Sequence, residues 1–206
     1  RYQSIIRQMR ILYIDNGVVE NNFKNVDVFP LSDYKQQFVI FSNTVQKGDY
    51  VIIIVSGHGY QKPCEKNEKE KDGLDEYISY NGGIIPDNEF RTSLIESILT
   101  HEPSRIVCLI DTCHSGTMFD IDQIVQQSQH RTTILSLAAC QDNQYDSCDI
   151  SDKIGFGGAL TVHLLEIDRS LDCLLYESYQ TIYQKLITPL QNTLSSLGQK
   201  PEFYYI

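Results

Sequence analysis

The chain has 206 residues, 27 of them acidic and 17 basic, and its formal net charge at pH 7 is -10. A chain of this length folds most simply as one domain and buries roughly 70% of the surface that it would expose unfolded. The negative charge argues against nucleic acid or an anionic membrane surface as partner, and suits cationic substrates or metal ions. Its apolar runs are far shorter than the ~20 residues that span a bilayer, so we expect a cytoplasmic protein.

The six cysteines form no CxxC pair and no zinc-binding spacing, which indicates a reducing compartment. Cys108 lies within an apolar run and Cys140 directly after one. We expect both to be small buried side chains of the core.

The beginning of the chain predicts two short strands and a helix. Residues 10–14 form an apolar strand that ends at the turn signal Asp-Asn-Gly, and residues 26–29 form a second one. A helix through residues 35–45 can be capped by Ser32 or Asp33.

Two longer apolar runs predict buried strands that each lead to a reactive side chain. Residues 50–55 are followed by Ser-Gly-His-Gly, which contains His58. Residues 106–110 stop at Asp111, two residues before Cys113. Because functional residues gather at the carboxyl ends of strands in an open parallel sheet, one histidine and one cysteine are expected there.

A loop, a hairpin and a helix are predicted between these two strands. Residues 61–73 carry alternating charges and are expected to form a solvated loop. Residues 77–80 and 84–85 predict short strands around an Asn-Gly-Gly turn. Asp87 can cap a helix over residues 89–99, whose apolar side chains share one face.

The remainder of the chain continues the alternation of strands and helices. A polar segment at 121–130 precedes a strand at 132–139, and a loop at 141–158 precedes helices at 159–166 and 176–190. Strands that are apolar throughout, alternating with helices, predict an α/β fold with a mostly parallel sheet covered on both faces.

Cys113 and His58 together suggest nucleophilic catalysis. A thiol attacks a carbonyl carbon well only as thiolate, so it needs a base or a positive field beside it. Histidine is the side chain best suited to proton transfer near neutral pH, and His58 stands between two glycines, where the backbone can turn sharply and expose the ring. His114 is a poorer base for Cys113, because neighbouring side chains at a strand end diverge.

These residues give the chain a resemblance to the metacaspases, the caspase-like cysteine peptidases of plants, fungi and protists. The segment Tyr-Val-Ile-Ile-Ile-Val-Ser-Gly-His-Gly at 50–59 resembles the family's histidine box, and Asp-Thr-Cys-His-Ser-Gly at 111–116 resembles its cysteine box. Further similar segments lie at 73–76, 85–90, 136–144, 157–161 and 198–201.

The resemblance implies a caspase-like, three-layer fold and an endopeptidase mechanism. Cys113 would be the nucleophile and His58 the general base and acid, while the backbone amides of Gly59 and Cys113 would form the oxyanion hole. Ser56, Asp111 and, more weakly, Asp142 match pocket positions, and an acidic pocket selects Arg or Lys. The alternative for Asp111 is a carboxylate that merely ends a strand.

The resemblance also implies activation by calcium, since many metacaspases bind Ca²⁺ through carboxylates near the site. Asp75 (or Asp72), Asp87 and Asp120 lie where such ligands would be expected, and oxygen donors suit this ion. The chain departs from the family where a frequent Asp-Asp pair reads Asp87-Asn88, which should weaken the site. Helix capping remains the alternative role for Asp87.

The whole chain, residues 1–206, is expected to be one peptidase domain, large-subunit-like over 1–125 and small-subunit-like over 131–206. The short segment between the two parts matches type I members. The family's first strand and the acidic loop after it should precede Ile5 and are expected to be missing. The chain opens on Arg1 rather than Met, so we expect an N-terminal segment to have been lost or removed.

Two functional readings remain open. The first is a Cys-His endopeptidase that acts as a monomer on protein or peptide substrates with Arg or Lys before the cleaved bond, with no nucleic-acid or membrane partner. The alternative is a catalytically inactive caspase-like domain that regulates or binds a partner. The intact His58 and Cys113 favour the first reading, and the missing strand favours the second.

Overall fold

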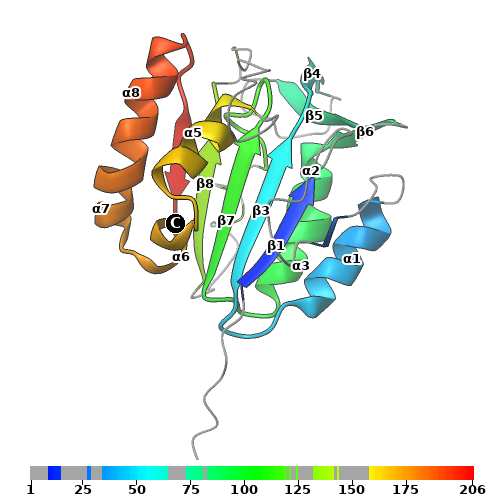
Figure 1. Cartoon of the computed structure of the whole chain (residues 1–206). Coiled ribbons are helices and arrows are strands. Elements are labelled where there is room, and N and C mark those ends of the chain that lie inside the picture. The colour runs from blue at the N-terminus through cyan, green and yellow to red at the C-terminus, as the bar shows by residue number, and fades with distance from the viewer. Residues whose placement is uncertain are drawn as a thin grey trace, which may run out of the picture.

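Six strands form the central sheet, in the order β2-β1-β3-β7-β8-β9 (Figure 1). The first five pair in parallel, and β9 is antiparallel to β8. The computed structural model describes residues 9–14, 27–28, 34–64, 73–80, 83–119, 121, 124, 132–141, 143 and 158–206. The strands are β1 (Met9–Ile14), β2 (Asp27–Val28), β3 (Tyr50–Ser56), β7 (Arg105–Asp111), β8 (Thr133–Ala138) and β9 (Glu202–Tyr205).

Alternate residues of the central strands enter two separate cores, one on each face of the sheet. On β3, Ile53 and Val55 belong to one apolar cluster, whereas Ile52 and Ile54 belong to the other. Because both faces are covered, every residue from 51 to 55 is buried, which explains the uninterrupted apolar run in the sequence.

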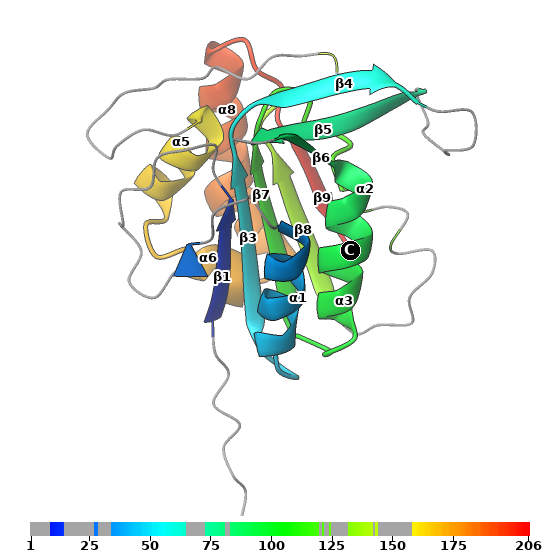
Figure 2. The same ribbon diagram turned by 90° about the vertical axis from the view of Figure 1, so that its right-hand side faces the viewer.

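The two faces are covered by helices from different parts of the chain (Figures 1 and 2). One face carries α1 (Tyr34–Thr44) and a continuous helical segment made of α2 (Asp87–Glu89), η2 (Phe90–Ile95) and α3 (Glu96–Leu99). The other carries α5 (Ala159–Ile167), α6 (Asp172–Tyr176), α7 (Tyr179–Ile182), η3 (Tyr183–Ile187) and α8 (Thr188–Ser196). This arrangement confirms the predicted three-layer α/β/α fold.

A small antiparallel sheet follows the histidine segment directly. It has the order β4-β5-β6 and consists of β4 (Gly59–Pro63), β5 (Leu74–Tyr80) and β6 (Gly83–Pro86). The prediction of a loop from residue 61 was wrong for residues 61–63, which belong to β4. Their polar sequence does not favour a strand, but pairing with the antiparallel strand β5 stabilises one. The contacts between the two strands include a 2.8 Å hydrogen bond from Gln61 Nε2 to Glu76 Oε1.

The predicted C-terminal helix also differs in its bounds. A break separates Tyr176, the last residue of α6, from α7, and the helical segment then continues to Ser196. Ser178 starts the new helix, because its hydroxyl accepts the backbone N–H of Thr181 at 3.3 Å.

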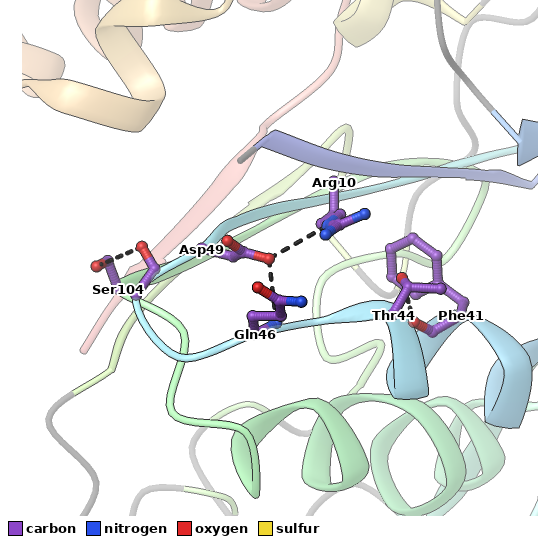
Figure 3. A network of polar contacts seen from close by, with 7 residues as sticks. Arg10, Phe41, Thr44, Gln46, Asp49 and Ser104 are labelled. Atoms are coloured by element: carbon purple, nitrogen blue, oxygen red, sulfur yellow. Dashed lines mark hydrogen bonds and ion pairs between the residues drawn. The ribbon is translucent and has the colours of Figure 1, made fainter. Parts of the chain in front are cut away.

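A buried carboxylate ties together the amino ends of β1, β3 and β7 (Figure 3). Oδ2 of Asp49, which is 2% exposed, lies 3.2 Å from Nε of Arg10 and accepts the N–H of Gln46 at 3.0 Å. The N–H of Ser104, just before β7, donates to the Asp49 carbonyl at 2.7 Å. These contacts fix the starting points of the strands whose opposite ends carry the reactive residues.

Within the described part of the chain, no helix combines the length and the apolar character needed to cross a membrane.

Candidate active site

His58 and Cys113 follow neighbouring parallel strands at the same edge of the sheet. The β3–β7 register pairs Ser56 with Asp111, so each reactive residue comes two positions after a member of the same pair. The ladder is extended by a 3.3 Å hydrogen bond from the N–H of Gly57 to the Asp111 carbonyl. His58 is exposed and Cys113 is half-buried, so a ligand can reach both side chains.

The two segments are packed against each other through backbone atoms. An ideal Cβ on Gly59 would lie 2.0 Å from the carbonyl oxygen of Cys113 and 3.0 Å from its carbonyl carbon. Real Cβ atoms do not approach other atoms so closely, so only glycine fits beside the cysteine. The chain immediately after His58 therefore lies directly on the turn that carries Cys113.

The turn that carries Cys113 (the cysteine turn) has an unusual backbone conformation and is bonded to a residue just beyond the end of β8. His114 has a φ of 54°, in the left-handed region that residues other than glycine seldom adopt. Ser115 is 0% exposed, and its hydroxyl is bonded to both the backbone N–H and the carbonyl of Cys140 at 3.2 Å each. The loop beyond β8 thus supports the turn.

Asp111 is 1% exposed, and its carboxylate faces the start of α5. Oδ2 accepts the N–H of Thr161 at 2.7 Å, and Oδ1 accepts the N–H of Leu160 at 3.3 Å. The first-turn amides of a helix have no partner within the helix, so this carboxylate acts as its cap from a distant strand. The observed contacts thus give Asp111 a structural role in capping α5.

The other predicted pocket residues can be placed only in part. Ser56 is half-buried at the end of β3, directly opposite Asp111 in the register. Asp142 lies outside the described residues. The pocket assignments for all three residues remain predictions.

Two of the three predicted calcium ligands lie among the described residues. Asp75, at the start of β5, is 4% exposed, and Asp87, directly after β6, is 0% exposed. Pairing of Tyr77 with Pro86 brings these ends of the two strands together, and the calcium role of the two carboxylates remains a prediction. Asp120 lies outside the described residues, and those described contain no group of three or more metal-binding side chains.

The side-chain amide of Asn88, next to Asp87, forms a hydrogen bond with Arg91. Asn88, which stands where an aspartate pair is frequent in the family, accepts a hydrogen bond from Arg91 through its side-chain oxygen. Its backbone N–H donates to Oδ1 of Asp87 at 2.7 Å. Asp87 is the first residue of the helix rather than its cap, since the cap position is Pro86.

The buried cysteines differ from Cys113 in their surroundings. Cys108 and Cys140 are fully buried, which confirms the prediction that both belong to the core. Burial raises the pKa of the Cys108 thiol to about 12, so this side chain stays protonated at neutral pH. All cysteines of the described part of the chain are free thiols.

Three residues at the site were not recognised from the sequence. Ser115, Gly158 and Leu160 lie in the segments quoted above but received no role. Gly158 was missed because its partner, Asp111, lies 47 positions earlier in the printed sequence (158 minus 111). Only the fold brings such residues together.

The structure thus places a cysteine and a histidine at the carboxyl ends of adjacent parallel strands within an α/β/α sandwich, as the resemblance to the metacaspases implies. The family model described as metacaspase, peptidase C14 domain, matches residues 14–122, which is more than half of the chain. The chain belongs to this family of cysteine peptidases.

Several curated metacaspases are similar to the chain. Metacaspase-7 of Arabidopsis thaliana is 36% identical over 89 residues, covering 43% of this chain and 21% of the relative. Metacaspase-6 of the same plant is 30% identical over 124 residues, covering 56% and 33%. Metacaspase-2 of Trypanosoma brucei brucei is 22% identical, covering 94% of this chain and 62% of the relative. The chain therefore spans less than two thirds of these relatives' length.

A solved structure supports the fold independently. The crystal structure of a protein from Geobacter sulfurreducens matches with a TM-score of 0.53 and 22% sequence identity, covering 85% of this chain and 73% of that one. At this identity the likeness concerns the fold alone.

Proposed function

We propose that the chain is the catalytic part of a cysteine endopeptidase that uses a Cys113–His58 dyad. The observation that carries this proposal is the contact of Gly59 with the carbonyl of Cys113, because it joins the two motif segments at one edge of the sheet. The exposure of His58 and the half-buried position of Cys113 are consistent with access by a substrate.

In the proposed reaction, the imidazole of His58 takes the proton of the Cys113 thiol, and the sulfur attacks the carbonyl carbon of the scissile bond. The backbone N–H groups of Gly59 and Cys113 donate to the oxyanion that forms. His58 then protonates the leaving amine as the C–N bond breaks. A water molecule, losing a proton to His58, finally hydrolyses the thioester and restores the thiol.

We further propose cleavage after Arg or Lys. Asp111 lies two residues before the nucleophile, with Ser56 opposite it in the sheet register. Its buried carboxylate accepts the amides of Leu160 and Thr161, and its negative charge, together with the net charge of -10, contributes to a potential that favours a cationic side chain at this edge. Asp142 is the third residue of the proposed pocket.

Calcium activation is proposed for the carboxylates of Asp75, Asp87 and Asp120. A bound Ca²⁺ would supply positive charge to the buried carboxylates of Asp75 and Asp87, which are otherwise costly to keep ionised away from water. Because Asn88 bonds with Arg91 and contributes no charge, we expect this site to be weaker than one with two adjacent aspartates.

The decisive test is hydrolysis of fluorogenic peptides that end in Arg, Lys or Asp, with and without millimolar calcium. Cys113→Ala should abolish cleavage, whereas Cys173→Ala, a matched change of a half-buried thiol on α6, should leave it intact. Cleavage after Asp would overturn the pocket assignment. A folded protein that cleaves no peptide in either condition would favour the alternative, an inactive domain that binds a partner.

A further inference from the structure

The turn that carries Cys113 begins where β7 leaves the sheet. The last bond between the neighbouring strands runs from the N–H of Ala139 to the carbonyl of Ile110, at 2.9 Å. Cys140, the residue after Ala139, is 0% exposed. Its backbone N–H and carbonyl groups must therefore form hydrogen bonds within the protein.

The Ser115 side chain meets this requirement with a single hydroxyl. It accepts the N–H of Cys140 at 3.2 Å and donates to the carbonyl of the same residue at 3.2 Å. A hydroxyl has one donor and two acceptor positions, so one serine can serve both backbone groups at once. The hydroxyl of Ser115 thus forms the hydrogen bonds with Cys140 that the backbone of β7 would form if the strand continued.

Cys140 also contacts the backbone on the N-terminal side of Cys113, at Thr112. Sγ of Cys140 donates to the carbonyl oxygen of Thr112 at 3.5 Å and lies 3.8 Å from Oγ of Ser115. Cys113 is therefore placed between two positions, 112 and 115, that are both fastened to Cys140. The intervening His114 keeps its left-handed backbone, which persists only where surrounding contacts enforce it.

We propose that Ser115 is a positioning residue for Cys113, acting through the backbone of Cys140. This inference rests on the proposed function, in which Cys113 is the nucleophile. Without the hydroxyl, the turn loses its anchor on one side, and the sulfur no longer holds its place relative to His58. Displacements of about 1 Å at a reacting centre can lower the rate on the order of 100-fold.

The test compares Ser115→Ala with Ser136→Ala, a matched change of a buried serine on β8 far from the turn. We expect Ser115→Ala to lower kcat by on the order of 10- to 100-fold while KM changes by less than about 2-fold. Ser136→Ala should leave both values near those of the unaltered protein. Cys140→Ala removes only the Sγ contacts with Thr112 and Ser115 and keeps the backbone anchor, so its loss of kcat should be smaller than that of Ser115→Ala.

A second readout follows Cys113 itself, without requiring peptide cleavage. The rate of Cys113 alkylation by iodoacetamide, measured by peptide mass spectrometry, should fall in Ser115→Ala at neutral pH. At alkaline pH, where an accessible thiol is ionised, it should equal that of the unaltered protein. If the unaltered protein cleaves no peptide, the proposed function fails while alkylation still tests the role of Ser115.

Equal kcat and alkylation profiles for Ser115→Ala and the unaltered protein would show that Ser115 is only a structural residue, and would overturn the proposal. If Ser115→Ala does not fold, Ser115→Thr, which retains the hydroxyl, replaces it. The folded threonine variant should keep the alkylation profile of the unaltered protein, and an altered profile would refute the assignment.

Discussion

The carboxylate of Asp111 occupies the space that a side chain would need at Gly158. An ideal Cβ at this glycine would lie 2.2 Å from Oδ1 of Asp111 and 2.6 Å from Oδ2. The close approach allows the carboxylate to reach the amides of Leu160 and Thr161. The strand end that precedes Cys113 is thereby joined to the start of α5.

Gly158→Ala should destabilise the protein by about 1–3 kcal/mol, because the methyl group and the carboxylate cannot share this space. Urea unfolding measures the change. As a control, Asp111→Ala removes the clash, so the double variant should be more stable than the sum of the single changes predicts, by about 1 kcal/mol or more. Additive effects would contradict the proposed clash.

Gly59→Ala should lower kcat on the order of 100-fold, since the added methyl group displaces the carbonyl of Cys113. The matched control is Gly73→Ala. An ideal Cβ at Gly73 meets no atom within 4 Å, although its φ of 81° makes alanine unfavourable by roughly 1–2 kcal/mol. Gly73→Ala should therefore change stability but not kcat. Similar losses of kcat in both variants would refute the contact argument.

Asp49→Asn should cost about 1–3 kcal/mol of unfolding free energy, because the buried acceptor that binds Arg10 and Gln46 loses its charge. The side chain of Arg10 is 25% exposed, and solvent therefore offsets part of the loss. Thermal unfolding measures the shift.

The control for this change is Glu102→Gln, which removes the same charge from the exposed pair with Lys47. Its effect should stay within about 0.5 kcal/mol. If both substitutions have the same small effect, Asp49 does not tie the strands as described.

Cys108 should make stability depend on alkaline pH. Its pKa is about 12 in the folded protein, against 9.0 as the ordinary value, because burial disfavours the thiolate. Between these values the unfolded chain has lost the proton that the folded chain retains. The unfolding free energy contributed by this group is therefore constant below pH 9 and falls by about 1.4 kcal/mol per pH unit above it.

Cys108→Val removes this titration while keeping an apolar side chain. Urea unfolding between pH 8 and 11 should therefore show a shallower loss of stability in the variant. Parallel curves for the two proteins would mean that Cys108 is ionised as readily in the folded state as in the unfolded one.

The central strands and the two reactive residues could be predicted because their signal is local. An uninterrupted apolar run is what burial on both faces requires, and the β3 and β7 strands both end within one residue of their predicted limits. His58 and Cys113 each lie two positions after the last residue of their strand. Fold class and the relative placement of His58 and Cys113 therefore followed from residues read in order.

The missed features depend on partners that are distant in sequence. The polar residues of β4 become a strand only because β5 pairs with them. Asp111 reaches α5 and Ser115 reaches Cys140 across 49 and 25 positions, respectively. No pattern within a short window specifies such a contact, since its free energy arises only when the sheet has formed.

The supports of the cysteine turn also set an order of assembly. Residues 58 and 113 are synthesised early, but Cys140 and the amides of Leu160 and Thr161, which hold the turn, emerge from the ribosome later. A nascent chain that ends before α5 carries both reactive side chains without the frame that aligns them. The frame of the cysteine turn is thus complete only once Cys140, beyond β8, and the first turn of α5 are both in place.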